Sequence, residues 1–520
     1  MRTLCVPFGA SASRTSGSSG FSAAPTAMSS QLRQLLQQQP LLLQQQQQQM
    51  QKQLQKLQSY LPHFTAGRLM STSSTDSSSM NSIGSISRRG SNCSRVVSLA
   101  GGELILEEHW GSQSVHPVFT LTLNRPSTLN AVSHDVLEQL LLFFKQKQPQ
   151  KGLTLLRGQG DKAFCAGGDV RALAAGDREF TISFFCKEYQ LDFLLAQQKG
   201  PTVVSLWDGI VFGGGVGLSV HGGLRVCTEK TLFAMPEVYI GVIPDAGLTQ
   251  TFAELKPRGL GLFLALTGER LRAADLMDTG LATHYLPSTR LPAAISRLQQ
   301  GVPLGADPTC WASQVLEEAG KVDPEGPLET PPSSDRLLQP HMLEFLERFF
   351  AHAESLQSLM ANLKENSGDC SLCRKTLESL QRACPLSLVV AFKAIRDREH
   401  ATAAAEATAT AANAAEAKAA SEAVQGDPAA RPEEKQKHQQ QREIQKRQRL
   451  QLLQDALEIE LVLMCNMTAV SNSNFVEGVR ALLVDKDKKP KWQPSCVSGV
   501  SQAAVTALFK WEGQRSLARL

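Results

Sequence analysis

Two carboxylates stand in a segment that is otherwise apolar. The stretch MPEVYIGVIPDAG, residues 235–247, places Glu237 and Asp245 each directly after a proline. A carboxylate among methionine, isoleucine and valine side chains loses hydration, which raises its pKa and suits general-base catalysis. The alternative is that both acids cap the turns that their prolines begin. The pattern alone leaves both interpretations open.

Two glycine-rich segments could supply the partner of such a base. They are AFCAGGDVRAL (163–173) and DGIVFGGGVGLSV (208–220). Each follows a predicted strand and precedes a predicted helix, so its backbone can approach a ligand with free N–H groups. The second lacks GK[ST], and Leu218 occupies the third glycine position of GxGxxG, which argues against a P-loop and a Rossmann loop. Two converging N–H groups would form an oxyanion hole; the alternative is two tight turns where helices pack on a sheet.

Alternating strands and helices have to position these segments. An amphipathic helix is predicted over 133–146, with Ser133 as its N-cap, and another begins near Asp169. The predicted strands are ELILEEHW (103–110), PVFTLTLN (117–124), GLTLLRG (152–158), TVVSLWDGIVF (202–212) and a strand pair in LRVCTEKTLFAMP (224–236). This alternation predicts an α/β fold.

Composition divides the chain into three parts. Residues 1–97 form a Ser/Arg/Gln-rich leader, 98–290 the α/β core, and 291–520 a mostly helical C-terminal region. An Ala-rich and then Lys/Arg/Gln-rich segment interrupts the C-terminal region at about 400–450. We interpret it as a low-complexity insertion, either a solvated helix or disorder, with a basic RNA-binding patch as the alternative.

Charge and the two termini limit the compartment and the partners. The first hundred residues hold nine Lys/Arg and one acid, typical of a transit peptide, so we expect a mitochondrial protein. The C-terminal Ala518-Arg519-Leu520 resembles a peroxisomal signal and is the alternative. The whole chain carries +4, so the remainder is mildly acidic, and no apolar run approaches the ~20 residues of a membrane span. We therefore expect neither nucleic acid nor membrane as a partner.

Several other reactive side chains are better explained by structure than by chemistry. The eleven cysteines are scattered, which fits a reducing compartment, and the one CxxC, Cys370 to Cys373, lacks a second pair, so no metal is expected. Cys165 has no neighbour that would lower its pKa, and we expect a small packing residue. A packing role is also expected for His221, and a helix cap or an ion pair for Asp169.

The motifs together resemble the crotonase (enoyl-CoA hydratase/isomerase) superfamily and, more closely, its 3-hydroxyisobutyryl-CoA hydrolase branch. Besides the glycine and acid segments, the matching stretches are NRPSTLNA (124–131), KEYQL (187–191), LALTGERL (264–271), GLATHYLP (280–287) and FVEGVRALLVDKDKKPKWQP (475–494). The resemblance covers roughly 101–400 and 450–500. It implies a spiral core of ββα units followed by a mostly helical C-terminal region.

The resemblance also implies roles for single residues. The Gly168 and Gly214 amides correspond to the oxyanion donors. Glu237 corresponds to the catalytic glutamate, and Asp245 to a second acid that positions the substrate hydroxyl or the water. The implied substrate-binding positions, the first of them at the CoA adenine, are Ala166, Gly167, Gly213 and Glu188. From the residues alone, Glu188 would be an exposed helix acid. No metal or separate cofactor is implied, because CoA is part of the substrate.

Three positions bear on the reaction. Hydratases carry a first catalytic glutamate where this chain has Gly217, and usually glycine where it has Asp245. Thioester cleavage needs only one nucleophile or base beside an activated carbonyl, so the pattern favours a hydrolase. Leu248 stands where the family usually has a second glycine, and we expect its bulk to narrow the acyl site or to shift the following helix.

We therefore predict an acyl-CoA thioester hydrolase that acts on 3-hydroxyisobutyryl-CoA in mitochondrial valine catabolism. Glu237 would attack as a nucleophile, giving a mixed anhydride, or activate water as a base. One alternative is a hydration or isomerisation of the crotonase type. Another is a non-catalytic protein associated with mitochondrial ribosomes, which the retained acids argue against. The superfamily often forms trimers, so a homo-oligomer is an open expectation.

Overall fold

The computed structural model describes residues 86–89, 92–111, 114, 116–147, 152–323, 326–334, 336–423, 431–468 and 473–510. Most of the predicted leader and the C-terminal tripeptide lie outside the described residues. The first described strands fall inside the segment predicted as leader, so the sheet begins earlier in the chain than the sequence indicates.

Eight strands form the main sheet, in the order β1-β2-β3-β4-β5-β7-β9-β11. Their bounds are β1 Ile86–Arg89, β2 Asn92–Leu99, β3 Leu104–Trp110, β4 Val118–Leu123, β5 Leu153–Gly158, β7 Thr202–Trp207, β9 Leu224–Cys227 and β11 His284–Tyr285. The first four strands run antiparallel to their neighbours, and pairing is parallel from β4 onward. All six residues of β4 are buried, as expected for a strand covered on both faces.

A second sheet of three parallel strands carries the segments of chemical interest. It consists of β6 Ala163–Cys165, β8 Ile210–Phe212 and β10 Leu232–Ala234, in the order β10-β8-β6. The predicted strand pair at 224–236 therefore exists as two strands that do not pair with each other. β9 continues the main sheet beside β7, and β10 joins β8 in the second sheet.

Helices cover both faces of the main sheet. One core packs alternate side chains of the sheet against α9 and α10, while a larger core packs the opposite face against α2 and α4. The predicted helix at 133–146 is confirmed as α2, with Ser133 Oγ accepting the Val136 N–H. The remaining elements discussed below are listed with these: α2 His134–Lys147, α3 Val170–Ala175, α4 Arg178–Gln197, α5 Gly214–Val220, η3 Glu237–Tyr239, α6 Leu248–Glu254, α7 Leu260–Thr267, α8 Ala273–Asp278, α9 Leu291–Leu298, α10 Pro308–Gly320, α13 Ser371–Arg382 and α16 Asn474–Val479.

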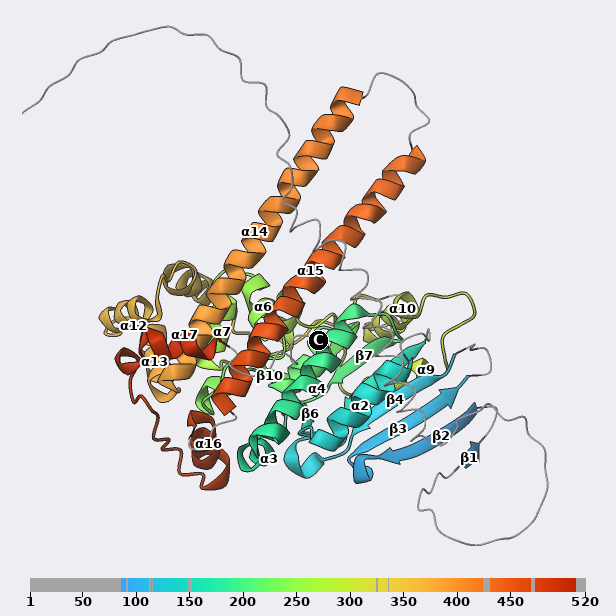
Figure 1. Cartoon of the computed structure of the whole chain (residues 1–520). Helices are drawn as coiled ribbons and strands as arrows, with labels where there is room; N and C mark the ends of the chain where they lie inside the picture. The colour runs from blue at the N-terminus through green and yellow to red at the C-terminus, as the bar shows by residue number, and fades with distance from the viewer. Residues whose placement is uncertain are drawn as a thin grey trace, which may run out of the picture. The chain divides into compact units, whose positions relative to one another are not determined.

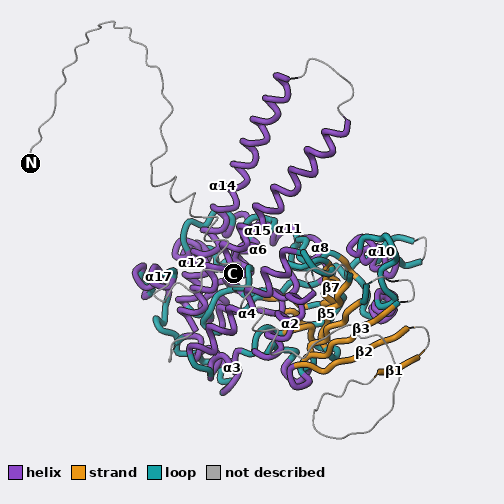
Figure 2. The backbone as a smooth tube through the Cα atoms, turned by 45° about the vertical axis from the view of Figure 1, so that its right-hand side comes forward, coloured by secondary structure: helices purple, strands orange, loops and turns teal. Residues whose placement is uncertain are grey.

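Two long helices, α14 Pro385–Ala423 and α15 Arg431–Thr468, project side by side from the rest of the described chain (Figures 1 and 2). Their described residues are helical through the segment predicted as an insertion, which favours a helix over disorder there. Where the pair meets the core, α14 packs on α6 and α7, and α15 packs on α4. Within the described residues, no helix combines the length and the apolar character needed to cross a bilayer.

Candidate active site

The three strands of the second sheet deliver three chain segments to one edge. β6 leads into Gly167 and Gly168, β8 into Gly213 and Gly214, and β10 into the segment that holds Glu237. Because the strands are parallel and adjacent, their carboxyl ends meet at the same edge. The fold therefore brings together segments that are separated by tens of residues in the sequence.

Two backbone amides converge at this edge. A Cβ placed on Gly167 would lie 3.3 Å from the Gly214 nitrogen, and one on Gly214 would lie 3.4 Å from the Gly168 nitrogen. In the backbone bridge beside Gly168, the Val132 N–H donates to Gly167 O and the Asp169 N–H donates to Val132 O. The Gly168 N–H takes no part in this bridge. Among the described residues, no acceptor pairs with the N–H of Gly168 or of Gly214. This arrangement can hold one anionic oxygen.

The glycines of the second segment make room for carboxylates. A Cβ on Gly213 would lie 2.8 Å from Glu237 Oε1, and one on Gly214 would overlap Glu188 Oε1. A Cβ on Gly217 would lie 3.0 Å from an oxygen of Asp192. Each missing side chain thus admits a different acid, which explains the glycine spacing at the start of α5.

Glu237 has the environment expected of a reactive carboxylate. It sits at the start of η3, and its Oε2 is buried without a hydrogen-bond partner among the described residues. Burial raises its pKa well above the ordinary range, and the nearby charges of Asp245 and Glu188 raise it further. Tyr239, two residues further along the chain, points away from this carboxylate, since its hydroxyl donates to Thr267 O at 2.8 Å.

Asp245 is oriented by a tyrosine that the sequence analysis missed. Tyr189 Oη donates to Asp245 Oδ2 at 2.6 Å, and both side chains are buried. Burial raises the pKa of Asp245 to about 6, while the Tyr189 hydrogen bond opposes the increase. Asp245 therefore ionises near neutral pH beside Glu237.

The helix α4 contributes two further acids. The prediction of an exposed helix position for Glu188 from residues alone is wrong, because its side chain is 3% exposed. Asp192, one helical turn later, is fully buried with both oxygens unpaired among the described residues. Burial raises the pKa of both groups, with smaller contributions from neighbouring carboxylates. The signal in KEYQLD was the i, i+4 spacing of Glu188 and Asp192, which puts both on one helix face.

The residues interpreted as structural occupy structural positions. Asp169 caps α3 through the Ala172 N–H and pairs with Arg125 at 2.9 Å. His221 Nε2 lies 2.6 Å from Ala246 O, and burial lowers the pKa of its ring to about 4, so the neutral ring donates there. Burial raises the pKa of the Cys165 thiol to about 12, which leaves it unreactive.

Leu248 and Ala166, two positions near the site, differ in burial. Leu248 is fully buried in the main hydrophobic core at the start of α6, and its N–H donates to Asp245 O at 3.0 Å. Its bulk is thus accommodated by core packing. Ala166 is half-buried beside the amide pair, and its N–H donates to Leu129 O at 3.0 Å.

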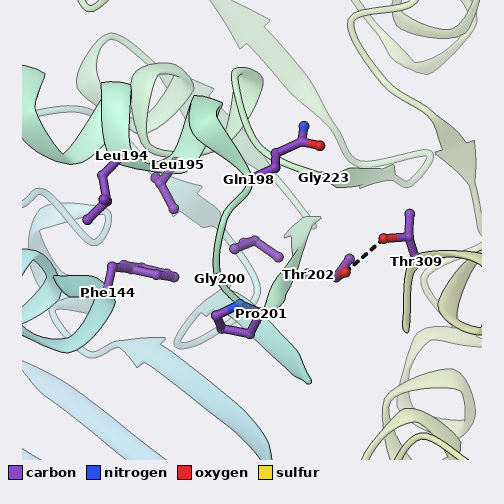
Figure 3. A pocket seen from close by; sticks show the side chains of 10 residues that line it. Phe144, Leu194, Leu195, Gln198, Gly200, Pro201, Thr202, Gly223 and Thr309 are labelled. Atoms are coloured by element: carbon purple, nitrogen blue, oxygen red, sulfur yellow. Dashed lines mark hydrogen bonds between the residues drawn. The ribbon is translucent and has the colours of Figure 1, made fainter. Parts of the chain in front are cut away.

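Cavities also lie outside the acid cluster. Figure 3 shows one of about 80 Å³, lined by Phe144 and Leu195 and closed by a 2.8 Å hydrogen bond between the Thr202 and Thr309 hydroxyls. It is too small for an acyl-CoA and contains none of the predicted site residues. A cavity of about 700 Å³ is lined by Tyr239 and by three cations and a tryptophan, which suit a phosphorylated ligand: Arg382, Lys488, Lys491 and Trp492.

Comparisons with known proteins agree with this architecture. The model of the enoyl-CoA hydratase/isomerase family matches residues 118–429 and 436–509. A mitochondrial 3-hydroxyisobutyryl-CoA hydrolase of Danio rerio is 33% identical over 430 residues, which are 81% of this chain and 93% of the relative. The 3-hydroxyisobutyryl-CoA hydrolase 1 of Arabidopsis thaliana is 30% identical over 80% of this chain and 93% of its own. The crystal structure of a carnitinyl-CoA dehydratase from Mycobacterium thermoresistibile is 26% identical, with a TM-score of 0.56 over 76% of this chain and 94% of that one.

Proposed function

The chain belongs to the enoyl-CoA hydratase/isomerase family, and from that premise we propose that it hydrolyses 3-hydroxyisobutyryl-CoA to the free acid and CoA. Related short 3-hydroxyacyl-CoAs are proposed as further substrates. The predicted crotonase fold is confirmed by the family match and by the structural likeness to the dehydratase. The curated relatives in fish and plant are named as hydrolases of this thioester.

One unpaired glutamate beside a pair of free amides supports hydrolysis over hydration. A hydratase would need a second glutamate at position 217, where this chain has glycine and where Asp192 lies too close for a longer side chain. Thioester cleavage needs one nucleophile or base and one oxyanion site. The arrangement around Glu237 supplies both.

In the proposed mechanism, the Gly168 and Gly214 amides hold the thioester oxygen as negative charge develops on it. Glu237 attacks the carbonyl carbon to give a mixed anhydride, or it takes a proton from the attacking water. In the first route CoA leaves as the thiolate, which takes a proton from water, and a water molecule then hydrolyses the anhydride to the free acid and the Glu237 carboxylate. In the second route the proton that Glu237 takes from water passes to the leaving thiolate. Asp245, held by Tyr189, orients the 3-hydroxyl or the water. Ala166, Gly167, Gly213 and Glu188 are proposed to line the acyl-CoA.

We place this reaction in mitochondrial valine catabolism. Relatives from Danio rerio and Gallus gallus are named mitochondrial, and the basic, acid-poor leader supports the same compartment. The proposed partner is the small acyl-CoA alone, without a metal or separate cofactor.

A thiol-release assay tests the function. Wild-type protein is compared on 3-hydroxyisobutyryl-, 3-hydroxypropionyl-, acetyl- and crotonyl-CoA, with Glu237→Gln and, as a matched control, the exposed Glu269→Gln. We expect Glu237→Gln to lower kcat by about 10²- to 10⁴-fold and Glu269→Gln to leave it unchanged. Consumption of crotonyl-CoA without thiol release would overturn the proposal in favour of hydration.

A further inference from the structure

A fifth buried acid contacts the site from the far end of the chain. Glu460 lies on α15, and its side chain is fully buried. Its carboxylate accepts the Gly247 N–H at 2.5 Å, the Thr249 N–H at 3.0 Å and the Thr249 hydroxyl at 2.5 Å. More than 200 residues separate these partners in the sequence, so the sequence analysis did not find the contact.

The segment that Glu460 holds is the turn that carries Asp245. The Leu248 N–H donates to Asp245 O at 3.0 Å, and His221 donates to Ala246 O, so side chains and backbone fix each residue after the acid. Gly247 has φ of +79°, and a Cβ there would meet His221 and Leu453 at 2.6 Å. The turn is therefore closely packed and has little freedom to move while the Glu460 contacts persist.

Glu460 is also placed on the helix that supports the other acids. α15 packs on α4, which carries Glu188, Tyr189 and Asp192. One helix thus backs the Asp245 turn through hydrogen bonds and the Tyr189 side of the site through packing. No Lys or Arg among the described residues pairs with the Glu460 carboxyl group. Burial raises the pKa of Glu460 to about 8, and the hydrogen bonds from Thr249 and Gly247 oppose the increase.

We propose that Glu460 is a positioning residue for the proposed hydrolysis. By binding the backbone of Gly247 and the backbone and hydroxyl of Thr249, it holds Asp245 where the substrate hydroxyl or the water must be oriented. The inference rests on the proposed function, because it assigns Asp245 its task. The C-terminal helical region thereby becomes part of the site.

A matched set of variants separates positioning from mere stability. Glu460→Gln keeps the shape but replaces one of the two accepting oxygens by an N–H₂ group, which faces either the Gly247 N–H or the Thr249 donors. Thr249→Val removes only the hydroxyl that donates to Glu460, whereas Thr249→Ser keeps a hydroxyl at this position. Asp275→Asn is the control: Asp275 is a fully buried carboxylate on α8 that accepts the Leu337 and Leu338 N–H groups at 3.0 Å, outside the acid cluster.

Two measurements are made on each folded variant: kcat and KM for thiol release, and hydrogen–deuterium exchange of residues 245–250. For Glu460→Gln we expect kcat to fall by about 10- to 100-fold with KM within about threefold, together with faster exchange. Thr249→Val should show a smaller fall that Thr249→Ser reverses. Asp275→Asn should lower the unfolding temperature and leave kcat within about twofold.

The outcomes are distinct for the two proposals. A kcat for Glu460→Gln equal to that of Asp275→Asn, or unchanged exchange at 245–250, overturns the positioning role. If Glu460→Gln does not fold, Thr249→Val against Thr249→Ser decides, and equal kcat values overturn the role. Wild-type protein that releases no thiol overturns the proposed function, while the exchange data still decide whether Glu460 holds the turn.

Discussion

Two groups of buried carboxylates in this molecule differ in what their oxygens meet. Asp275 and Glu460 each accept N–H groups from distant backbone. Asp192 and Glu237 have buried oxygens with no partner among the described residues. The paired acids join the C-terminal region to the α/β core, whereas the unpaired acids surround the glycine turns of α5.

This difference separates acids that hold the fold from acids kept for a ligand. A buried polar group without a partner destabilises the folded state, so a cluster of such groups is expected where function requires it. Glu237 lies beside Gly213 and Asp192 beside Gly217, close in sequence to Gly214, whose amide is unpaired like that of Gly168. Donors and acceptors without partners thus occur together, and a substrate is the proposed partner of both.

After Glu237→Gln, the largest effect is expected from filling the space at Gly214. Gly214→Ala would place a methyl group over Glu188 Oε1 and 3.4 Å from the Gly168 nitrogen. The helix start must then shift and one oxyanion donor moves, so kcat for thiol release should fall by about 10²- to 10³-fold. Such a fall would show that the unpaired amides of Gly168 and Gly214 act only while the turn keeps its geometry.

Gly222→Ala provides the control, because a Cβ there has its nearest neighbours at 3.5 Å and 3.9 Å. Circular dichroism verifies that both variants fold. A Gly214→Ala enzyme within about threefold of wild type would mean that the amide pair is not the oxyanion site.

The local part of the site was accessible from the sequence. Strand–glycine–helix patterns identified both turns, and two acids in an apolar run identified Glu237 and Asp245. Each of these signals is contained within one short segment of the sequence, where hydrophobic periodicity and turn chemistry are informative. The α/β class followed from the same patterns, and the family resemblance added the crotonase topology.

The non-local part was not accessible. The spacing in α4 places Tyr189 beside Glu188, but it does not say that this face is buried against α5 and α15. Glu460 stands between Ile459 and Leu461 on a long helix, and its sequence does not say which partner covers that face, so the contact it makes is a tertiary effect. Likewise, β9 and β10 do not pair with each other, because β9 pairs in parallel with β7 and β10 pairs in parallel with β8.

A smaller effect is expected from Tyr189→Phe, which removes the only hydroxyl that donates to Asp245 among the described residues. Burial holds the pKa of Asp245 at about 6, and the lost donor should raise it by on the order of one unit. Since the ionised form is the one proposed to act, the acidic limb of the pH–kcat profile should move to higher pH. We expect about fivefold lower kcat at pH 6 and a change within about threefold at pH 8.

Tyr285→Phe is the matched control, since Tyr285 lies on β11 and, among the described residues, its hydroxyl binds no carboxylate of the site. The pH–kcat profile of each variant is measured between pH 5 and 9. A Tyr189→Phe profile that falls by the same factor at every pH would show that Tyr189 serves packing and does not tune Asp245.

The smallest effect is expected on the stability of the Asp192→Asn variant. Burial raises the pKa of Asp192 well above its ordinary value of 3.8, so the folded state binds a proton that the unfolded state releases. The free energy of unfolding must then decrease as pH rises above about 4, by up to about 1.4 kcal/mol per pH unit, until the folded-state pKa is passed. An asparagine side chain at this position cannot ionise, so the stability advantage of Asp192→Asn over wild type should grow from pH 5 to pH 7 in urea unfolding.

The exposed Asp369→Asn should show no such growth, and Asp275→Asn should be less stable than wild type, because its carboxylate has two N–H donors to lose. If the free energy of unfolding rises in Asp192→Asn and falls in Asp275→Asn, the two groups of acids differ in hydrogen-bond pairing and not in burial. If both variants lose the same free energy of unfolding, Asp192 has a partner in solution. Glu237 would then be the one acid left in the unpaired group.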